Sequence, residues 1–555
     1  MNATHQSVVS DLNALHFNTA SKWLWRSLPK FADGRFVACD VSNRLSLSRL
    51  RQKRIRCVVQ FKHYLRVCCR FTEVQCHFTE KISSKRISRP PSADETWRYT
   101  PMQKSITSSL LTALIMTVVS GYSASAQSFE IDTHKTQYAG DSIEIVVSGL
   151  PPQSEVELRA RRVLKNHYAP GAPIQTYASS ARFLVGDDGR IDVSGSAAVG
   201  GSYEGIDPNG LFWSMRPVDD DSVVADPRIE LEAIIDGESV ASAAFDLVQA
   251  PQDYTVQEVP ALPGSYFAAN PNPGDHPVII IVGGADKLKV NRETVMPQLV
   301  SQGYSVFFFA TYEIIYGPSE PSVKELPTRY VDIPVDQLQD VRNWLAEQPG
   351  VDEGRIGLYG YSRNAAYVLL AATRFDWIDA VAAIAPSDVV WEGWGDGVKL
   401  GTTSSYSWEG EPLAYVPYSD NWYRETAKFG RGERGRLRTP MEEGRRDNPK
   451  RVAEARIPIE QYTGALLVAG GEQDDLWSAG HMAQNMAERR AENGLATELL
   501  VFPDAGHSLV GDGQNPIILL YEADEVRPSL AKAQNRTWRT TLELFDNALK
   551  TRENH

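Results

Sequence analysis

The stretch Arg355-Ile-Gly-Leu-Tyr-Gly-Tyr-Ser-Arg-Asn364 joins an apolar run to a second run, Asn364-Ala-Ala-Tyr-Val-Leu-Leu-Ala-Ala-Thr373. The first run predicts a buried strand over residues 356–360, and the second predicts a helix over residues 364–373. Ser362 lies at the turn between them. A serine at such a strand–turn–helix junction has its hydroxyl raised above the sheet edge, where a substrate can reach it. The stretch therefore predicts a largely parallel sheet with a nucleophile at one strand end.

The residues on either side of this serine only partly follow the expected pattern. A strained turn needs small residues two positions before and two positions after the serine. Gly360 meets the first requirement, whereas Asn364 stands where the motif has glycine. Asparagine tolerates unusual backbone angles but adds side-chain bulk. A lone Gly-x-Ser is a weak signal, so the interpretation depends on the partners of the serine.

Two candidate partners follow later strand-like runs. Asp474 lies 112 residues after Ser362, behind the run 464–469, and His507 lies another 33 residues on, behind the run 499–502. A serine hydroxyl needs an adjacent base. We expect His507 to accept its proton and Asp474 to fix the histidine tautomer. The order Ser, Asp, His is that of α/β-hydrolases, so the sequence predicts a serine hydrolase.

The acid assignment leaves one neighbouring alternative open. Asp475 follows directly, and we favour Asp474 because it lies three residues from both Gly471 and Trp477. A solvated loop or a helix cap would also explain the pair of aspartates, and a surface histidine would explain His507.

An acyl-transfer site also needs donors for the developing oxyanion. We expect the backbone N–H of Arg363 to be one donor, and the loop after residues 277–283, at Gly284 and Ala285, to supply the other. A plain turn is the alternative for the two glycines at 283 and 284. A Gly-x-Gly-x-x-Gly string at 430–435 follows no strand, so no dinucleotide site and no cofactor are expected.

The first hundred residues differ in composition from the rest. All five cysteines precede Met102. Residues 1–101 hold 18 Lys+Arg and 7 Asp+Glu, a net charge of +11, whereas the whole chain carries −13 and the remainder therefore −24. The chain therefore joins a basic segment that contains all the cysteines to an acidic segment that contains none.

A second start signal opens at Met102. Lys104 is followed by an apolar run over 110–119 and then by Ala124-Ser-Ala126, the pattern of a cleaved secretory signal. We expect residues 102–126 to be a signal peptide and residues 1–101 to be spurious or disordered. A basic extension and an internal signal anchor are the alternatives. The product would be exported to a periplasm or secreted.

The remaining 429 residues, 127–555, contain no cysteine. A thiol nucleophile and Cys-based metal sites are therefore excluded there, and no metal is expected. The acidic balance argues against nucleic acid as a partner. No further apolar span suggests a membrane segment. We expect a small-molecule substrate. The oligomeric state stays open.

Two domains fit this length. Short alternating runs over 127–255 predict an antiparallel β-sandwich. After a Pro-rich passage, strands alternate with helices over 256–555, which predicts a doubly wound α/β sheet. The alternation fails over 388–456, which we interpret as a lid insertion. It is rich in tryptophan, and its basic stretch 424–451 has 10 Lys+Arg against 5 Asp+Glu, which is typical of a solvated face or of a phosphate site. That phosphate site would use four arginines: Arg431, Arg434, Arg436 and Arg438.

The stretch Gly201-Ser-Tyr-Glu-Gly-Ile-Asp-Pro-Asn-Gly-Leu-Phe-Trp-Ser-Met215 resembles the acyl-CoA thioesterase and bile acid-CoA:amino acid N-acyltransferase family. Residues 471–478 and 502–507 are similar to the same family, so the resemblance spans about 128–550. It implies an N-terminal β-sandwich, an acyl-CoA substrate, and the nucleophile, acid and base at Ser362, Asp474 and His507.

The resemblance also implies a preference between two reactions. The conjugating transferase of the family uses a cysteine nucleophile, so a serine here implies hydrolysis of acyl thioesters. Asn364 departs from the family elbow. An export signal conflicts with a coenzyme A thioester as substrate, because these thioesters are cytosolic. The alternatives are therefore an exported carboxylesterase or acyl-peptidase on the same scaffold, or a catalytically inactive binding protein.

Overall fold

The structure is a computed structural model that describes residues 130–165, 173–218, 224–285, 290–315, 320–431, 433–517 and 526–551. All of these residues fall within one compact unit, Val118–His555. The predicted extension 1–101 and the predicted signal peptide 102–126 lie outside the described residues.

Two β-sheets form the N-terminal part of the described chain. The larger sheet has the order β2-β10-β9-β4-β5-β7, with β8 paired to β5, and the smaller has the order β1-β3-β6. Every pairing is antiparallel except that between β2 and β10. The strands are β1 (Glu130–Asp132), β2 (Thr136–Tyr138), β3 (Val146–Ser148), β4 (Glu155–Lys165), β5 (Ile174–Leu184), β6 (Ile191–Asp192), β7 (Ala198–Gly201), β8 (Arg216–Pro217), β9 (Arg228–Ile235) and β10 (Glu238–Val248).

Alternation along these strands explains how the two sheets are held. In β4, Val156 and Leu158 are buried while the residues between and beside them are more exposed, as expected for a strand with one face on a core. Val147 of β3 and Ile191 of β6 belong to the same buried apolar core. The two sheets therefore share one core.

The family-like stretch forms a compact turn around the short helix α4 (Gly210–Trp213). The buried Asp207 carboxylate accepts hydrogen bonds from the Asn209 backbone N–H and the Trp213 indole N–H, both at 3.0 Å. Burial raises the pKa of Asp207. The Tyr203 ring occupies the space that a Cβ at Gly210 would need. The stretch is therefore a packing unit, which explains why glycine stands at 210.

One large sheet organises the C-terminal part. Its order is β11-β12-β14-β13-β16-β17-β20-β21, antiparallel across β11, β12 and β14 and parallel from β14 to β21. The strands are β11 (Gln257–Glu258), β12 (Tyr266–Ala268), β13 (His276–Gly284), β14 (Ser305–Tyr312), β16 (Val351–Tyr361), β17 (Ala380–Ile384), β20 (Ala465–Gly471) and β21 (Glu498–Phe502). The Pro-rich passage before residue 277 thus already supplies two strands.

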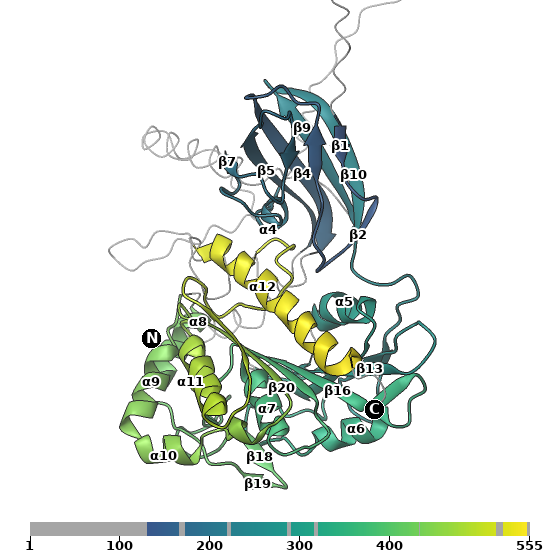
Figure 1. The fold of residues 1–555 in the computed structure, drawn as a ribbon. Coiled ribbons are helices and arrows are strands. Elements are labelled where there is room, and N and C mark those ends of the chain that lie inside the picture. Colours follow the sequence, from purple (N-terminus) through teal and green to yellow (C-terminus); the bar gives the residue numbers. More distant parts are fainter. Residues whose placement is uncertain are drawn as a thin grey trace, which may run out of the picture. The chain divides into compact units, whose positions relative to one another are not determined.

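Helices cover both faces of this sheet (Figure 1). The helices α5 (Met296–Ser301) and α12 (Arg527–Phe545) contribute to the buried core that contains Ile279 and Ile281 of β13. The helices α6 (Leu338–Leu345), α7 (Arg363–Ala372) and α11 (Ala479–Glu492) contribute to the core that contains Ile280 and Val282. Neighbouring residues of one strand therefore lie in separate cores, as in a sheet buried on both sides. Shorter helical segments within the described ranges include π-helices at Asn291–Val295 and Asp546–Lys550 and a 3₁₀ turn at Ile459–Gln461.

An insertion separates β17 from β20. It contains β18 (Tyr406–Trp408), β19 (Glu411–Pro412), α8 (Trp422–Gly430), α9 (Arg438–Asp447) and α10 (Pro449–Glu454), and β18 pairs with the earlier strand β15 (Ile333–Pro334). Trp391, Tyr418 and Trp422 of the insertion share a small core with Trp477 and Met482 from beyond β20. Because the insertion follows the carboxyl end of β17, it lies at the sheet edge where substrates bind in open α/β folds.

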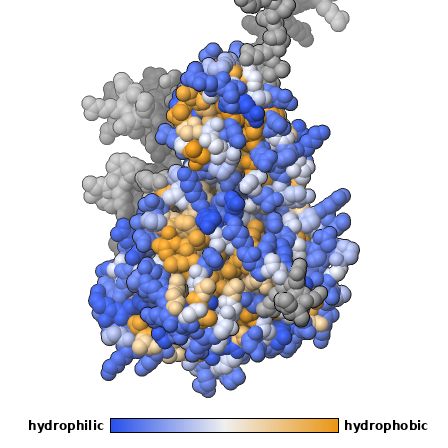
Figure 2. Space-filling view, in the orientation of Figure 1, coloured by the Kyte–Doolittle hydropathy of each residue, from blue (hydrophilic) through white to orange (hydrophobic). Residues whose placement is uncertain are grey.

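The last feature of the fold is the distribution of apolar residues on its surface. On the face drawn in Figure 2 hydrophilic residues predominate and apolar residues form separate patches. Within the described ranges, no helix combines the length and the apolar composition that a membrane crossing needs.

Candidate active site

Ser362 stands at the sharp turn between β16 and α7. Its φ of 61° and ψ of −126° are unusual for a residue with a side chain. Its backbone N–H donates to the carbonyl of Ile384 on the next strand at 2.8 Å, and its own carbonyl accepts from the N–H of Ala365 at 3.0 Å. These two bonds hold the strained conformation while the residue stays half-exposed. Backbone strain of this kind is typical of functional sites.

The two flanking positions have different physical explanations. A Cβ at Gly360 would collide with the backbone carbonyl of Asn364, so glycine is required there. The buried Asn364 side chain donates to the hydroxyl of Tyr312 at 3.3 Å. Burial raises the pKa of that Tyr312 phenol, which keeps it neutral. The Tyr312 ring in turn fills the space beside Gly284, so Asn364 connects the turn to the end of β13.

The structure brings Ser362, His507 and Asp474 together in one chain of hydrogen bonds. The distance from His507 Nε2 to Ser362 Oγ is 2.9 Å, and that from His507 Nδ1 to Asp474 Oδ2 is 2.7 Å. The side chains of His507 and Asp474 are fully buried. With Nδ1–H donating to the carboxylate, Nε2 is free to accept the serine proton. This is the geometry that a serine nucleophile and its base require.

Backbone contacts fix the acid and the histidine loop relative to each other. The second oxygen of Asp474 accepts the N–H groups of Leu476 at 2.7 Å and Trp477 at 3.2 Å. The N–H of Gln473 donates to the carbonyl of Ala505 at 3.0 Å. A Cβ at Gly471 would collide with that same carbonyl oxygen. Glycine at 471 therefore lets the two loops touch.

Asp475 faces away from His507 and toward the insertion. Its carboxylate pairs with Arg434 at 2.5 Å and with Arg436 at 3.8 Å. The other two arginines of the predicted phosphate site are also paired, Arg431 with Glu433 at 2.7 Å and Arg438 with Glu442 at 2.6 Å. The geometry therefore favours Asp474 as the partner of the histidine and offers no support for a phosphate site in this stretch.

The predicted oxyanion donors lie in two places: Arg363 begins α7, whereas Gly284 and Ala285 lie at and just after the end of β13. The backbone N–H of Arg363 is the first of helix α7 and has no acceptor within that helix. The N–H of Ala285 donates to the carbonyl of Tyr312 at 2.8 Å. That N–H is therefore already engaged in this structure, because sheet pairing continues past β13, and the oxyanion role of Ala285 stays a prediction. Gly284, which pairs with Tyr312 at the end of β13, is the remaining predicted position on this side.

Sequence reasoning used only the backbone of Arg363 and missed its side chain. The guanidinium lies 5.3 Å from the ring centres of Tyr330 and Trp394, and 5.9 Å from those of Tyr418 and Trp477. The Trp477 ring also packs edge-on against the imidazole of His507 at 4.7 Å. The density of tryptophan in the insertion was the available signal, but no pattern in the sequence connects it to position 363.

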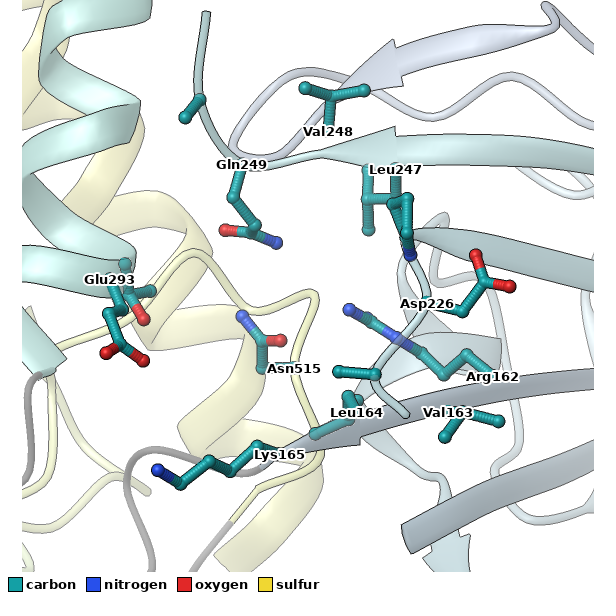
Figure 3. Close-up of a pocket in the computed structure, with 14 residues that line it drawn as sticks. Arg162, Val163, Leu164, Lys165, Asp226, Leu247, Val248, Gln249, Glu293 and Asn515 are labelled. Atoms are coloured by element: carbon teal, nitrogen blue, oxygen red, sulfur yellow. The ribbon is translucent and has the colours of Figure 1, made fainter. Parts of the chain in front are cut away.

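A separate pocket of about 390 Å³ lies elsewhere. Its lining includes residues of β4, β10 and the loop before α12 (Figure 3). Ser362, Asp474 and His507 are not among the lining residues. Figure 3 shows the buried Arg162 side chain extending toward Gln249 and Asn515. The Arg162 guanidinium donates to the carbonyl of Gln514 at 3.3 Å. Within the described ranges, no cluster of His, Cys, Asp and Glu is arranged to hold a metal ion.

The strand order, the serine at a sharp strand–helix turn and the order Ser, Asp, His along the chain define an α/β-hydrolase. Two additional sheets, antiparallel except for the β2–β10 pair, precede it.

Comparison with known proteins places this α/β-hydrolase more narrowly. Residues 140–233 match the sequence model of the acyl-CoA thioester hydrolase/BAAT N-terminal region, and residues 436–511 match the model of the BAAT/acyl-CoA thioester hydrolase C terminus. Residues 264–390 match the dienelactone hydrolase family. The chain is thus similar to the acyl-CoA thioester hydrolase/BAAT family in both regions, which confirms the resemblance predicted from its motifs.

Individual relatives agree with these matches. Acyl-coenzyme A thioesterase 1 of Mus musculus is 25% identical over 385 residues, covering 66% of this chain and 82% of the relative. Human acyl-coenzyme A thioesterase 2, mitochondrial, is 24% identical, covering 66% and 71%. Acyl-coenzyme A amino acid N-acyltransferase 1 of Mus musculus is 22% identical, covering 75% and 96%. Among solved structures, a putative dienelactone hydrolase from Klebsiella pneumoniae aligns with a TM-score of 0.31 and 16% identity, over 51% of this chain and 91% of that chain.

Proposed function

We propose that this protein hydrolyses acyl thioesters through an acyl-enzyme formed on Ser362. The observation that carries the proposal is the continuous hydrogen-bond chain from Ser362 Oγ through His507 to the buried Asp474. The relatives named acyl-coenzyme A thioesterase support the choice of substrate class.

The steps follow from this arrangement. His507 Nε2 accepts the serine proton as Oγ attacks the acyl carbonyl, and the Arg363 backbone N–H donates to the oxyanion. The imidazolium returns the proton to the leaving thiol as the carbon–sulfur bond breaks. A water molecule then attacks the acyl-enzyme and loses a proton to His507. The bond from the acyl carbon to Ser362 Oγ breaks, the imidazolium returns the proton to Oγ, and the carboxylic acid leaves. Asp474 stabilises the imidazolium in both halves of the reaction.

A second candidate function differs in the leaving group of the substrate. The signal-like segment 102–126 favours an exported protein, and coenzyme A thioesters are cytosolic. We therefore retain an exported carboxylesterase or acyl-peptidase on the same scaffold as the alternative. The export itself is a proposal, and it places the protein in a periplasm or outside the cell.

Two measurements on residues 127–555 test the function. A fluorophosphonate probe should label Ser362 in the wild type and fail to label Ser362→Ala. Turnover of an acyl-CoA series compared with p-nitrophenyl esters of the same acyl groups separates the two substrate classes. Ser362→Ala should lower kcat by roughly 10⁴ to 10⁶ while the protein stays folded. Unchanged turnover in this variant would rule out the serine, and no labelling at all would favour an inactive binding protein.

A further inference from the structure

Resting on the proposed function, we infer that the Arg363 side chain binds an anionic group of the substrate, a carboxylate or a phosphate, close to the nucleophile. Arg363 follows Ser362 directly and is half-buried beside it. The same residue then serves the reaction twice, with its backbone N–H at the oxyanion and its guanidinium as the determinant of which substrates are selected.

The hydrogen bonds of the guanidinium are largely unused. An arginine side chain carries five N–H donors. Among the described residues, the hydrogen bond that it donates is the one to the Tyr418 hydroxyl, at 2.9 Å. Four of the groups around it are aromatic rings, which attract a cation through their faces but accept no strong hydrogen bond. The cation is therefore held in position with donors to spare.

Within the described residues no carboxylate pairs with this cation. Glu392 is the acidic group whose charge interacts with it, and that carboxylate is fully buried. Its oxygens accept the backbone N–H groups of Tyr418, at 3.0 Å, and of Gly401. Burial raises the pKa of Glu392. The guanidinium thus faces an acid that is already occupied by backbone donors.

Charge and geometry together indicate the ligand. A cation removed from water is costly unless an opposite charge meets it. Carboxylates and phosphates match the planar fork of arginine and form strong charge-assisted hydrogen bonds. Trp477 packs against the His507 imidazole and the Arg363 guanidinium alike, so an anion bound here lies one ring away from the reacting centre. A neutral acyl chain would leave the cation unpaired.

The anion can come from either half of a thioester, and paired substrates separate the two sources. Glutaryl and pentanoyl thioesters of N-acetylcysteamine differ by a carboxylate on the acyl side. Pentanoyl-CoA and pentanoyl-N-acetylcysteamine differ by the phosphates of the leaving group. We expect kcat/KM of the wild type to favour the anionic member of one pair. In Arg363→Met that ratio should fall by about 10- to 100-fold, with Arg363→Lys intermediate because it keeps the charge and loses the fork.

Arg374 provides a matched control, because its guanidinium lies over the Trp408 ring at 4.7 Å on an exposed part of the chain beyond α7. Arg374→Met should leave the ratio unchanged. Direct binding of glutarate and of ADP to Ser362→Ala, measured by calorimetry and repeated with Arg363→Met added, gives a readout without turnover.

The outcomes separate the two ideas. If the neutral thioester is turned over and neither pair shows a preference, the anion site is overturned and the hydrolase proposal stands. The same holds if a preference is seen and survives Arg363→Met. Anion binding that depends on Arg363, in a protein that turns over none of the thioesters, supports the site and refutes the proposed function.

Discussion

Replacing Asp474 with asparagine is the sharpest test of the site, because the change alters hydrogen-bond direction without changing size. The carboxylate accepts His507 Nδ1–H at 2.7 Å through one oxygen and two backbone N–H groups through the other. An asparagine keeps its oxygen on the backbone donors, since both of them need an acceptor. Its NH₂ group then points at Nδ1 and can only donate.

The consequence is a change of tautomer. With Nδ1 accepting, the proton moves to Nε2, which faces Ser362 Oγ at 2.9 Å. The base can then no longer accept the serine proton. In hydrolases with this triad the same substitution lowers kcat by about 10⁴, which corresponds to about 5.5 kcal/mol of transition-state stabilisation. We expect a loss of this size in Asp474→Asn.

The adjacent aspartate is a matched control one residue away. Asp475→Asn removes ion pairs with Arg434 and Arg436, whose side chains are 43% and 66% exposed. Exposed pairs contribute about 0–1 kcal/mol, so activity should change by no more than about fivefold.

The assay is kcat/KM for a p-nitrophenyl ester or an acyl thioester in the wild type and both variants, with thermal unfolding to check folding. A reversed ranking would move the acid to Asp475. Asp474→Asn with more than a tenth of wild-type activity would refute the tautomer argument.

Three further predictions concern other parts of the chain. Asn364→Gly and Asn364→Ala should each lower kcat/KM by about fivefold, because a neutral hydrogen bond to Tyr312 contributes about 1 kcal/mol; equal or higher values in both would show that the side chain is only tolerated. For Asp207, the raised pKa means that the folded state holds its proton more tightly than the unfolded state does, so its contribution to stability is complete below about pH 4 and is lost as pH rises through the folded value. The Tm of the wild type minus that of Asp207→Asn should therefore shrink as the pH rises above about 4, and a constant difference would contradict the burial argument. N-terminal sequencing of the exported protein should begin near Gln127, whereas a mature end near Met1 would defeat the proposed signal at 102–126.

The turn around Ser362 could be predicted in detail because its causes are local. An apolar run, a glycine and a helical run specify a strand, a tight turn and a helix, and the structure places β16 and α7 there. The partners Asp474 and His507 could be proposed because each follows its own strand, and parallel strands bring their carboxyl ends to one edge. Their catalytic role stays a prediction until activity is measured.

Other features depend on contacts between distant segments and could not be predicted. The engagement of the Ala285 N–H is set by how far β13 pairs with β14, which no local pattern fixes. The same holds for the aromatic rings around Arg363, which come from the segments around 330, 394, 418 and 477. From the sequence alone, the arginines of the insertion predict either a phosphate site or a solvated face. Their pairing with Asp475 and Glu433 is visible only in three dimensions.

The two neighbouring aspartates also limit how this chain can be re-engineered. Asp474 orients the histidine, while Asp475, on the very next peptide unit, ties the insertion down through Arg434 and Arg436. The insertion is therefore not a freely exchangeable module. A grafted replacement that lacks a cation for Asp475 would leave that carboxylate, which is 19% exposed, without its ion pairs next to Asp474. Libraries that vary residues 388–456 should keep arginine at 434 and 436, and should also keep Trp394 and Tyr418 beside Arg363.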